Sequence, residues 1–261
     1  MTNNNLASNN PLPLVSVIIP VLNGVSHLEC AIKSVIDQKY SNIELIVIDG
    51  NSIDGTVDII KRYEDRIACW ISEPDNGIYD AMNKGVRLSH GEWVYFMGAD
   101  DVLLNILHQI VRSFQDRQTI YYGDVFMTSN HKIYAGKFTA KKLGNKNIPH
   151  QAMFYPKSVF DKYCYDTKYS VFADYHLNIR CFGDKTYHFE YIKVLVAIFN
   201  DCGRSSNGND AVFFDNFVDL LKMHLREELG AIYLLRKQFR KTKKALKRKI
   251  ECYMKSIVPK R

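Results

Sequence analysis

Acidic side chains directly follow apolar, strand-like segments of this chain, and this placement is the feature of the sequence best suited to chemistry. Asp49 follows the apolar segment 43–48, and Asp100 and Asp101 follow the segment 93–97. Carboxylate oxygens, together with phosphate oxygens, are ligands that Mg²⁺ and Mn²⁺ prefer. Asp100 and Asp101 are therefore predicted to bind such a cation, which would neutralise a departing diphosphate. The alternative is that Asp101 caps a following helix while Asp100 is hydrated.

Asp49 begins a loop of small and polar residues, DGNSIDGT at 49–56. A carboxylate at this position could accept hydrogen bonds from a ribose or a base edge, but the same residue types also favour tight turns, and both interpretations stay open.

The motifs of several other classes of active site are absent from the sequence. No Gly-x-Gly occurs, so the dinucleotide-binding fingerprint is absent, and Thr56 stands where a phosphate loop needs its lysine. Neither Gly-x-Ser-x-Gly nor His-Glu-x-x-His is present.

The segments that must position these side chains alternate between strand and helix patterns. Short apolar runs predict strands at 14–19, where Pro20 ends the run, and at 43–48, 67–71 and 93–97. Between them, the patterns predict helices at 26–38, 55–63 and 76–88, the last capped by Asp75. This alternation predicts a parallel sheet whose strands all end at one edge, where ligands of such sheets bind. Asn23, Asp49, Asp75, Asp100 and Asp101 are therefore expected near one another.

The second half of the chain is less regular. Its patterns predict a helix at 102–114, strands at 119–127 and 132–138, a helix at 172–182 and a strand at 187–199. Residues 150–155 follow a Lys/Asn/Gly loop, and within them His150 and Gln151 precede a strand-like apolar run. A Gly/Ser/Asn-rich loop covers 201–210, and an amphipathic helix follows it up to a break at Gly230. No internal repeat is found.

Composition limits the class of protein. The 261 residues are 46% hydrophobic, which is enough to fill a large core and excludes disorder for most of the chain. The six cysteines form no Cys-x-x-Cys pair, so a disulfide framework or a zinc site is not expected. We find no apolar run of about 18 residues and no secretory signal at the N-terminus, and therefore expect a cytoplasmic protein.

The charge is distributed unevenly. Residues 231–261 hold twelve Lys/Arg and one acid (12 − 1 = +11), whereas residues 1–230 hold 23 Lys/Arg and 27 Asp/Glu (23 − 27 = −4). Apolar residues recur along the basic tail at spacings of three or four, which is typical of a helix that lies on an anionic membrane surface. A nucleic-acid arm and a helix packed on a second subunit are the alternatives. Because no nucleic-acid-binding module accompanies the tail, we expect no nucleic acid and favour the membrane.

Four motifs occur in a characteristic order: PVLNG at 20–24, DGNSIDGT at 49–56, SEPDNGIYDAMNKG at 72–85 and FMGADD at 96–101. Together they resemble family 2 glycosyltransferases, which are inverting enzymes with the GT-A fold, and in particular bacterial enzymes that extend O-antigen or capsule polysaccharide. The resemblance is close over 14–105 and looser over 106–206. It implies an α/β protein with a Rossmann-like, mostly parallel sheet and helices on both faces, to which amphipathic C-terminal helices are added.

The resemblance also implies site residues. In such enzymes the turn after the first strand and the aspartate of the second strand hold the nucleotide of the donor. A helix N-terminus lies near its diphosphate, which suits an anion. A polar pair lies near the donor sugar, and a flexible loop covers the diphosphate. The matching positions of this chain are Pro20, Leu22, Asn23, Asp49, Asp75, Asn76, Gly77, Ala99, Asp100, His150, Gln151 and Arg204.

The metal motif and the base complete what the resemblance implies. The family's metal motif is Asp-x-Asp, whereas this chain has Gly98-Ala99-Asp100, so the first carboxylate is missing. Asp100 would still bind Mn²⁺ or Mg²⁺. Inversion needs a general base for the acceptor hydroxyl, and the best match is Asp174 in FADYHL at 172–177. Asp166 and His176 are rival candidates.

The predicted function is therefore inverting transfer of a hexose or N-acetylhexosamine from a nucleotide sugar, with UDP as the favoured nucleotide, to a polyprenyl-diphosphate-linked saccharide. The enzyme would be peripheral on the inner face of the cell membrane, and oligomerisation is left open. The predicted regions are a leader at 1–13, a nucleotide-sugar-binding half at 14–105, an acceptor-binding half at 106–209 and a basic, membrane-associating helical segment at 210–261. The alternatives are a sugar-phosphate nucleotidyltransferase and a binding module that has lost its chemistry.

Overall fold

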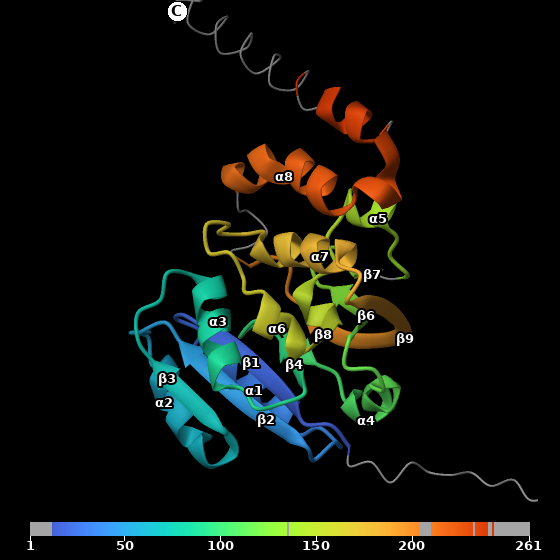
Figure 1. The fold of residues 1–261 in the computed structure, drawn as a ribbon. Helices are drawn as coiled ribbons and strands as arrows, with labels where there is room; N and C mark the ends of the chain where they lie inside the picture. Colours follow the sequence, from blue (N-terminus) through green and yellow to red (C-terminus); the bar gives the residue numbers. More distant parts are fainter. Residues whose placement is uncertain (1–11, 135, 204–209, 232, 240–241, 243–261) are drawn as a thin grey trace, which may run out of the picture.

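One sheet of nine strands runs through the computed structural model, which describes residues 12–134, 136–203, 210–231, 233–239 and 242 (Figure 1). The strand order is β3-β2-β1-β4-β8-β6-β9-β5, and β7 pairs with β6. The strands are β1 (Val15–Val21), β2 (Ile43–Asp49), β3 (Cys69–Ser72), β4 (Trp93–Phe96), β5 (Val102–Leu103), β6 (Thr119–Met127), β7 (Lys132–Tyr134), β8 (Met153–Pro156) and β9 (His188–Phe199).

Most of the strands run in one direction. β1 to β4 are parallel to one another, β8 is antiparallel to both β4 and β6, and β9 is parallel to β6. Six of the nine strands (β1, β2, β3, β4, β6 and β9) therefore share a direction, which confirms the predicted mostly parallel sheet. Because β4 pairs with β8, the two halves of the chain contribute to the same sheet.

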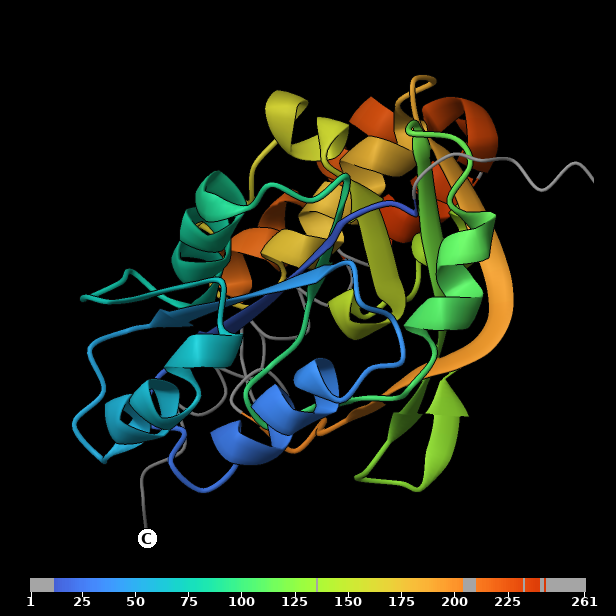
Figure 2. The ribbon, with the colours of Figure 1, turned by 90° about the horizontal axis from the view of Figure 1, so that it is seen from below.

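Helices cover both faces of this sheet. They are α1 (Leu28–Ile36), α2 (Thr56–Arg62), α3 (Ile78–Leu88), α4 (Leu107–Ile110), α5 (Ala140–Leu143), α6 (Ser158–Lys162), α7 (Ala173–Gly183) and α8 (Ala211–His224), with 3₁₀ turns at Glu64–Arg66, Val111–Ser113 and His150–Ala152. Figure 2 shows α1 and α2 on one face and α3, α6 and α7 on the other. This arrangement, with the strand order above, is the GT-A fold that the sequence predicted.

The central strand β1 runs past the proline that was expected to end it. All seven of its residues are buried; six are apolar, and the hydroxyl of the polar Ser16 accepts a hydrogen bond from Gly91 N (2.9 Å). Its pairing with β4 stops at Ile18, whose carbonyl oxygen accepts a hydrogen bond from Met97 N (3.2 Å). Pro20 faces the same side two residues later, where no partner strand remains, so its missing N–H removes no ladder bond. The strand therefore continues to Val21 and ends directly before the turn at 22–24.

Two local predictions were wrong. Residues 102–114 do not form one helix: Val102 and Leu103 pair with β9, and α4 begins only at Leu107. The pairing joins segments almost 100 residues apart, which a local pattern does not reveal. Asp75 does not cap α3. The N-cap is Gly77, with φ 108°, and Asp75 instead accepts a hydrogen bond from Gly77 N (2.8 Å).

The helix α8 packs on α7 through aromatic side chains. Phe213 is fully buried there, whereas the adjacent Phe214 is half exposed. The helix ends at His224, before the predicted break at Gly230, which has φ 71°. Within the part of the chain that the structure describes, no helix is both long enough and apolar enough to cross a bilayer. Most of the basic tail, 243–261, lies outside the described residues.

Candidate active site

A cavity of about 420 Å³ opens where β1 and β4 end. Its walls come from the turn after β1, the loop after β4, the beginning of α3, residues 150–151, residues 170–171 and the chain after β9. Ten of the thirteen residues predicted to bind the nucleotide sugar or the metal line it: Pro20, Leu22, Asn23, Asp75, Gly77, Ala99, Asp100, Asp101, His150 and Gln151. The cavity therefore lies at the sheet edge where the strand order predicted a ligand site.

The turn after β1 is held by the loop after β2. Asn23 adopts a left-handed conformation (φ 54°), which asparagine tolerates better than most residues. Its side-chain oxygen accepts a hydrogen bond from Ile53 N (3.0 Å), and its own N–H donates to Ser52 Oγ (2.7 Å). The backbone of the turn is thereby fixed at the cavity wall by contacts that come from a neighbouring strand.

The structure places Asp49 behind this wall, in place of the direct nucleotide contact that we expected. Its side chain is completely buried. The carboxylate accepts hydrogen bonds from Ser52 N (3.0 Å), Ser52 Oγ (2.5 Å) and Ser72 Oγ (2.6 Å). Asp49 therefore joins the loops after β2 and β3, and its effect on the cavity is indirect.

Asp75 occupies space that Gly50 leaves open. A Cβ atom at position 50 would lie 2.5 Å from Asp75 Oδ2, a distance that real side chains do not tolerate. The glycine thus allows the Asp75 carboxylate to pack on the loop after β2 and to line the cavity. Asn76 is exposed and does not line the cavity, although it was predicted to contact the nucleotide. Its N–H donates to Asp80 Oδ2 (3.0 Å) at the beginning of α3.

Asp100 and Asp101 differ in environment. Asp101 is 1% exposed, and its carboxylate accepts hydrogen bonds from Gly98 N (2.7 Å), Gln151 Nε2 (2.9 Å) and Asn200 N (2.9 Å). Burial raises its pKa to about 6, although these hydrogen bonds oppose the shift. Asp101 therefore holds the loop after β4 together. Asp100 is less buried and accepts a bond from Asn200 Nδ2 (2.9 Å) on Oδ2.

The missing first carboxylate of the metal motif has a steric reason. A Cβ atom at Gly98 would lie 2.8 Å from Asp100 Oδ1 and 2.9 Å from Asp101 Oδ2. An aspartate at position 98 would have to displace both carboxylates, and it would add a third negative charge beside them. The glycine is thus part of how this loop places Asp100 at the cavity.

The geometry fits a divalent cation held chiefly by the donor substrate. No cluster of three or more His, Cys, Asp or Glu side chains suitable for a metal occurs among the described residues. Of the adjacent pair Asp100 and Asp101, Asp100 is the carboxylate available to a cation, since Asp101 is committed to three donors. Mg²⁺ and Mn²⁺ are often bound by one or two carboxylates together with substrate phosphates and water. Asp100 would hold such an ion, with Asp101 behind it.

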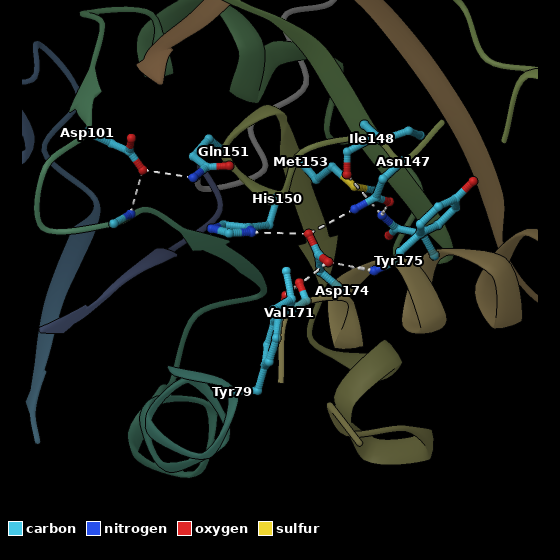
Figure 3. Close-up of polar contacts among 12 residues, drawn as sticks. Tyr79, Asp101, Asn147, Ile148, His150, Gln151, Met153, Val171, Asp174 and Tyr175 are labelled. Carbon is cyan, nitrogen blue, oxygen red and sulfur yellow. Dashed lines mark hydrogen bonds and ion pairs between the residues drawn. The ribbon is translucent and has the colours of Figure 1, made fainter. Parts of the chain in front are cut away.

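Asp174, the predicted base, is set back from the cavity. It lies at the beginning of α7, is 6% exposed and does not line the cavity. Its carboxylate accepts hydrogen bonds from Tyr175 N (2.7 Å), Asn147 Nδ2 (2.9 Å) and Tyr79 Oη (3.0 Å), and His150 Nδ1 lies 3.3 Å from Oδ2 (Figure 3). His150 and Tyr79 line the cavity themselves. Asp174 therefore contacts two residues of the cavity wall, and its role as the base stays a prediction.

The other predicted residues fall outside the cavity. His176 does not line it and packs on the ring of Tyr169 (centroids 4.9 Å apart). Asp166 pairs with Lys168 Nζ (2.7 Å). Arg204 lies outside the described residues. Neither rival base is therefore placed among the residues that form the cavity wall.

His176 provides a test of this placement. Burial lowers its pKa from 6.5 to about 4, and Arg180 adds to the effect; Lys168 and His224 also lower the pKa, while Asp166 opposes them. Because the unfolded chain binds this proton more tightly, the free energy of unfolding should fall as the pH decreases from about 6.5 to 4. We expect His176→Gln to flatten the pH dependence of Tm in this range and to keep the wild-type turnover at pH 7.5.

The measurement is a set of thermal melts between pH 4 and 7.5, with the exposed His188→Gln as the matched control. The control should keep the wild-type slope. Loss of turnover in His176→Gln, without a change in Tm at pH 7.5, would return His176 to the list of catalytic candidates.

Sequence reasoning missed two polar residues of this site. Tyr79 belongs to the motif at 72–85 but was given no role, although its hydroxyl contacts both Asp174 and Val171 O (2.6 Å). Asn200 follows the strand β9 and bonds to both Asp100 and Asp101. Its signal was a polar residue at the end of a strand, the same signal that identified Asp49 and Asp100.

Comparisons with a family model and with curated proteins both find similarity to glycosyltransferases. The family model described as "Glycosyl transferase family 2" matches residues 16–196. A PGL/p-HBAD biosynthesis glycosyltransferase of Mycobacterium tuberculosis is 34% identical over 232 residues, which cover 85% of this chain and 90% of the relative. An uncharacterized glycosyltransferase of Rickettsia prowazekii is 29% identical over 197 residues, or 69% of this chain and 62% of that protein.

Solved structures share the fold. Staphylococcus aureus TarS, residues 1–349 in complex with UDP, aligns with a TM-score of 0.67 and 13% identity, over 82% of this chain and 66% of that one. The mannosyltransferase PcManGT from Pyrobaculum calidifontis, in complex with GDP-Man and Mn²⁺, aligns with a TM-score of 0.58 and 17% identity, over 88% of this chain and 65% of that one. This chain thus spans about two thirds of each.

Proposed function

Because the chain belongs to glycosyl transferase family 2, we propose that it transfers a hexose or N-acetylhexosamine, with inversion, from a UDP-sugar to a lipid-linked saccharide in the synthesis of a bacterial surface polysaccharide. The observation that carries this proposal is the cavity at the ends of β1 and β4, which Asp100 lines beside the loops of both strands. TarS binds UDP in a related fold, which supports the choice of nucleotide.

The donor would lie across the ends of β1 and β4. In this arrangement Leu22 and Asn23 contact the nucleoside, while Gly77 and the first N–H groups of α3 face the diphosphate, where a helix N-terminus favours negative charge. Gln151 Oε1 is buried without a hydrogen-bond partner among the described residues. A hydroxyl of the donor sugar would supply the missing donor. Arg204 is proposed to reach the diphosphate from the loop after β9.

A divalent cation, Mn²⁺ or Mg²⁺, would supply Lewis-acid stabilisation of the diphosphate when bound at Asp100. The protein itself contributes the position of the Asp100 carboxylate through the bond from Asn200, and the shape of the loop through Asp101. The complex of PcManGT with GDP-Man and Mn²⁺ supports metal use by a protein of this fold.

The experiment that tests the function measures nucleoside diphosphate release. Purified protein is incubated with Mn²⁺ and, separately, with UDP-GlcNAc, UDP-glucose, UDP-galactose and GDP-mannose. Release of UDP from a UDP-sugar supports the proposal. Release of pyrophosphate from UTP and a sugar 1-phosphate would indicate a nucleotidyltransferase instead, and donor binding without any release would indicate a binding module.

The lipid-linked acceptor requires access to a membrane, and the basic tail is proposed to provide it. Removing residues 243–261 takes away eight Lys/Arg and one acid (8 − 1 = +7) and leaves α8 complete. Each basic residue near an anionic surface contributes about 1 kcal/mol, so we expect the truncated protein to lose most of its affinity for vesicles of anionic lipid.

Co-sedimentation with vesicles that contain 30% phosphatidylglycerol, compared with vesicles of phosphatidylcholine alone, measures this loss. Turnover of a water-soluble donor should not change, because the cavity lies within the retained residues. Unchanged sedimentation of the truncated protein would contradict the role of the tail.

A further inference from the structure

A segment rich in lysine interrupts the mildly acidic body of the protein. Residues 1–230 carry a net charge of −4 (23 − 27), yet the sequence between Asp124 and Asp161 contains six lysines and no acid. Three of these lysines, Lys137, Lys141 and Lys146, are exposed, and none of the three pairs with an acid among the described residues. Their charge is therefore available to a partner outside the chain.

The three exposed lysines belong to one compact loop around α5, residues 136–147, which we call the lysine loop. Tyr134 Oη donates a hydrogen bond to Asn147 O (2.6 Å), so the two ends of the loop are held together. Within it, Lys142 Nζ donates to Gly136 O (3.0 Å), which ties α5 to the beginning of the loop. The loop thus holds its exposed lysines close to one another.

The helical segment 233–239 packs beside the lysine loop. Tyr233 Oη donates a hydrogen bond to Gly144 O (3.3 Å), directly after α5. A Cβ atom at position 144 would lie 2.9 Å from this hydroxyl, so the glycine permits the contact. Figure 1 shows the helix that follows α8 next to α5. The segment from which the basic tail continues in sequence therefore lies at the lysine loop.

The outer side of this helical segment is apolar. Leu234 is 4% exposed and joins the core, whereas Leu235 and Phe239 are 67% and 70% exposed. Leu235 and Phe239 are four residues apart, so they lie on the same side of the helix, and the exposed Arg236 follows Leu235. Exposed apolar side chains accompanied by cations are typical of a helix that lies on a membrane surface.

We propose that the lysine loop and the outer side of 233–239 form one docking surface for an anionic membrane. Lys137, Lys141 and Lys146 would contact the lipid headgroups. Leu235 and Phe239 would enter the boundary between the headgroups and the acyl chains. The combination of charge and exposed apolar surface selects this partner, because a soluble anion would leave Leu235 and Phe239 uncovered.

Such docking would bring the cavity close to the membrane. Only four residues of chain lead from Lys146 to His150 in the cavity wall, and they span at most about 14 Å. Asn147, the first of them, donates a hydrogen bond to Asp174 (2.9 Å). The proposal deepens the membrane role given to the tail above and rests on the lipid-linked acceptor, but vesicle binding can be measured without any sugar.

The first test neutralises the lysine loop in the full chain by the triple substitution Lys137→Gln, Lys141→Gln and Lys146→Gln. Each basic residue near an anionic surface strengthens binding by about fivefold, so we expect a loss of roughly 10²-fold in affinity. Co-sedimentation with a concentration series of vesicles that contain 30% phosphatidylglycerol measures it. The matched control neutralises three exposed cations of the first half of the chain: Lys39→Gln, Lys61→Gln and Arg87→Gln.

The second test isolates the apolar contribution with Leu235→Ser and Phe239→Ser combined. At about 0.5 M NaCl the attraction between charges more than roughly 4 Å apart is screened, so the remaining affinity for the same vesicles reports apolar insertion. We expect the double variant to lose most of this remaining affinity and the lysine-loop variant to keep it. Thermal melts should give the wild-type Tm for both variants, because all five side chains are exposed.

Three outcomes would overturn the docking surface. One is a wild-type protein that does not bind the anionic vesicles. Another is a lysine-loop variant that loses no more affinity than the control triple. The third is unchanged vesicle binding of that variant with slower transfer to a water-soluble saccharide, which would assign the lysines to a substrate. A wild type that binds vesicles but turns over no nucleotide sugar would count against the transferase and leave the docking surface supported.

Discussion

Asp100→Ala is expected to lower metal-dependent turnover by at least about 10²–10³-fold, the usual effect of removing one group that stabilises charge in a transition state. Asp100 lines the cavity, whereas Asp101 is held by Gly98, Gln151 and Asn200. Loss of Asp100 therefore removes the carboxylate of this pair that is available to a cation. Because the side chain is only partly buried, the fold and Tm should change little.

The measurement pairs turnover with calorimetric binding of UDP at zero and 5 mM Mn²⁺. In the wild type, Mn²⁺ should tighten UDP binding, and in Asp100→Ala this gain should disappear while metal-free binding remains. Asp65→Ala, an exposed aspartate that precedes β3, is the control for a general effect of charge. If Asp100→Ala kept both its turnover and its Mn²⁺-dependent affinity, the metal would have to bind elsewhere.

The first half of the fold could be predicted because its signals are local. The strands β1, β2 and β4 are short, apolar and β-branched or aromatic, and the helices between them are amphipathic, so their limits agree with the predictions within a few residues. The direction of the crossovers then brings the strand ends together without further information. This reasoning was sufficient to bring Asn23, Asp75 and Asp100 to one cavity.

The failures have a shared physical origin, which is that residue type and position do not determine where a side chain points. Asp49 and Asp100 both follow strands, yet Asp49 is completely buried because Ser52 and Ser72 supply donors on the inner side of the loop. Asp174 begins a helix as predicted, but the contacts of its carboxylate with Tyr79 and His150, which come from elsewhere in the chain, could not be foreseen.

Long-range pairing accounts for the wrong element. Leu103 was assigned to a helix at 102–114, whereas it belongs to a two-residue strand that pairs with β9. The role of Gly98 could not be foreseen either. In the sequence, the glycine indicates only that a metal ligand is missing. The short distances from a Cβ atom at position 98 to the carboxylates of Asp100 and Asp101 show that a side chain would not fit there.

Phe213→Ala is expected to lower the free energy of unfolding by about 3–5 kcal/mol, the range for deleting a buried phenylalanine. The ring is 0% exposed and lies between α8 and α7, with Tyr169, Phe172, Tyr175 and Phe217 at centroid distances of 5.6, 5.1, 5.3 and 5.3 Å. The same helix end carries Asp210, which accepts hydrogen bonds from Val171 N (3.0 Å) and Phe172 N (3.3 Å) at the edge of the cavity. We therefore expect turnover to fall as well.

The adjacent Phe214→Ala is the matched control, because Phe214 has the same chemistry and the same helix but is 51% exposed. It should cost about 1 kcal/mol or less, as substitutions of partly exposed residues usually do. Urea unfolding monitored by circular dichroism gives both free energies. Equal m values, the slopes of the unfolding free energy against urea concentration, would show that the two variants can be compared. The two expectations together predict a difference of about 2–4 kcal/mol in the free energy of unfolding between the two variants. Such a difference would show that α8 is an integral part of the fold and holds α7, and with it Asp174, in place. Equal effects of the two substitutions would mean that α8 is only loosely attached and that α7 is held by the sheet alone.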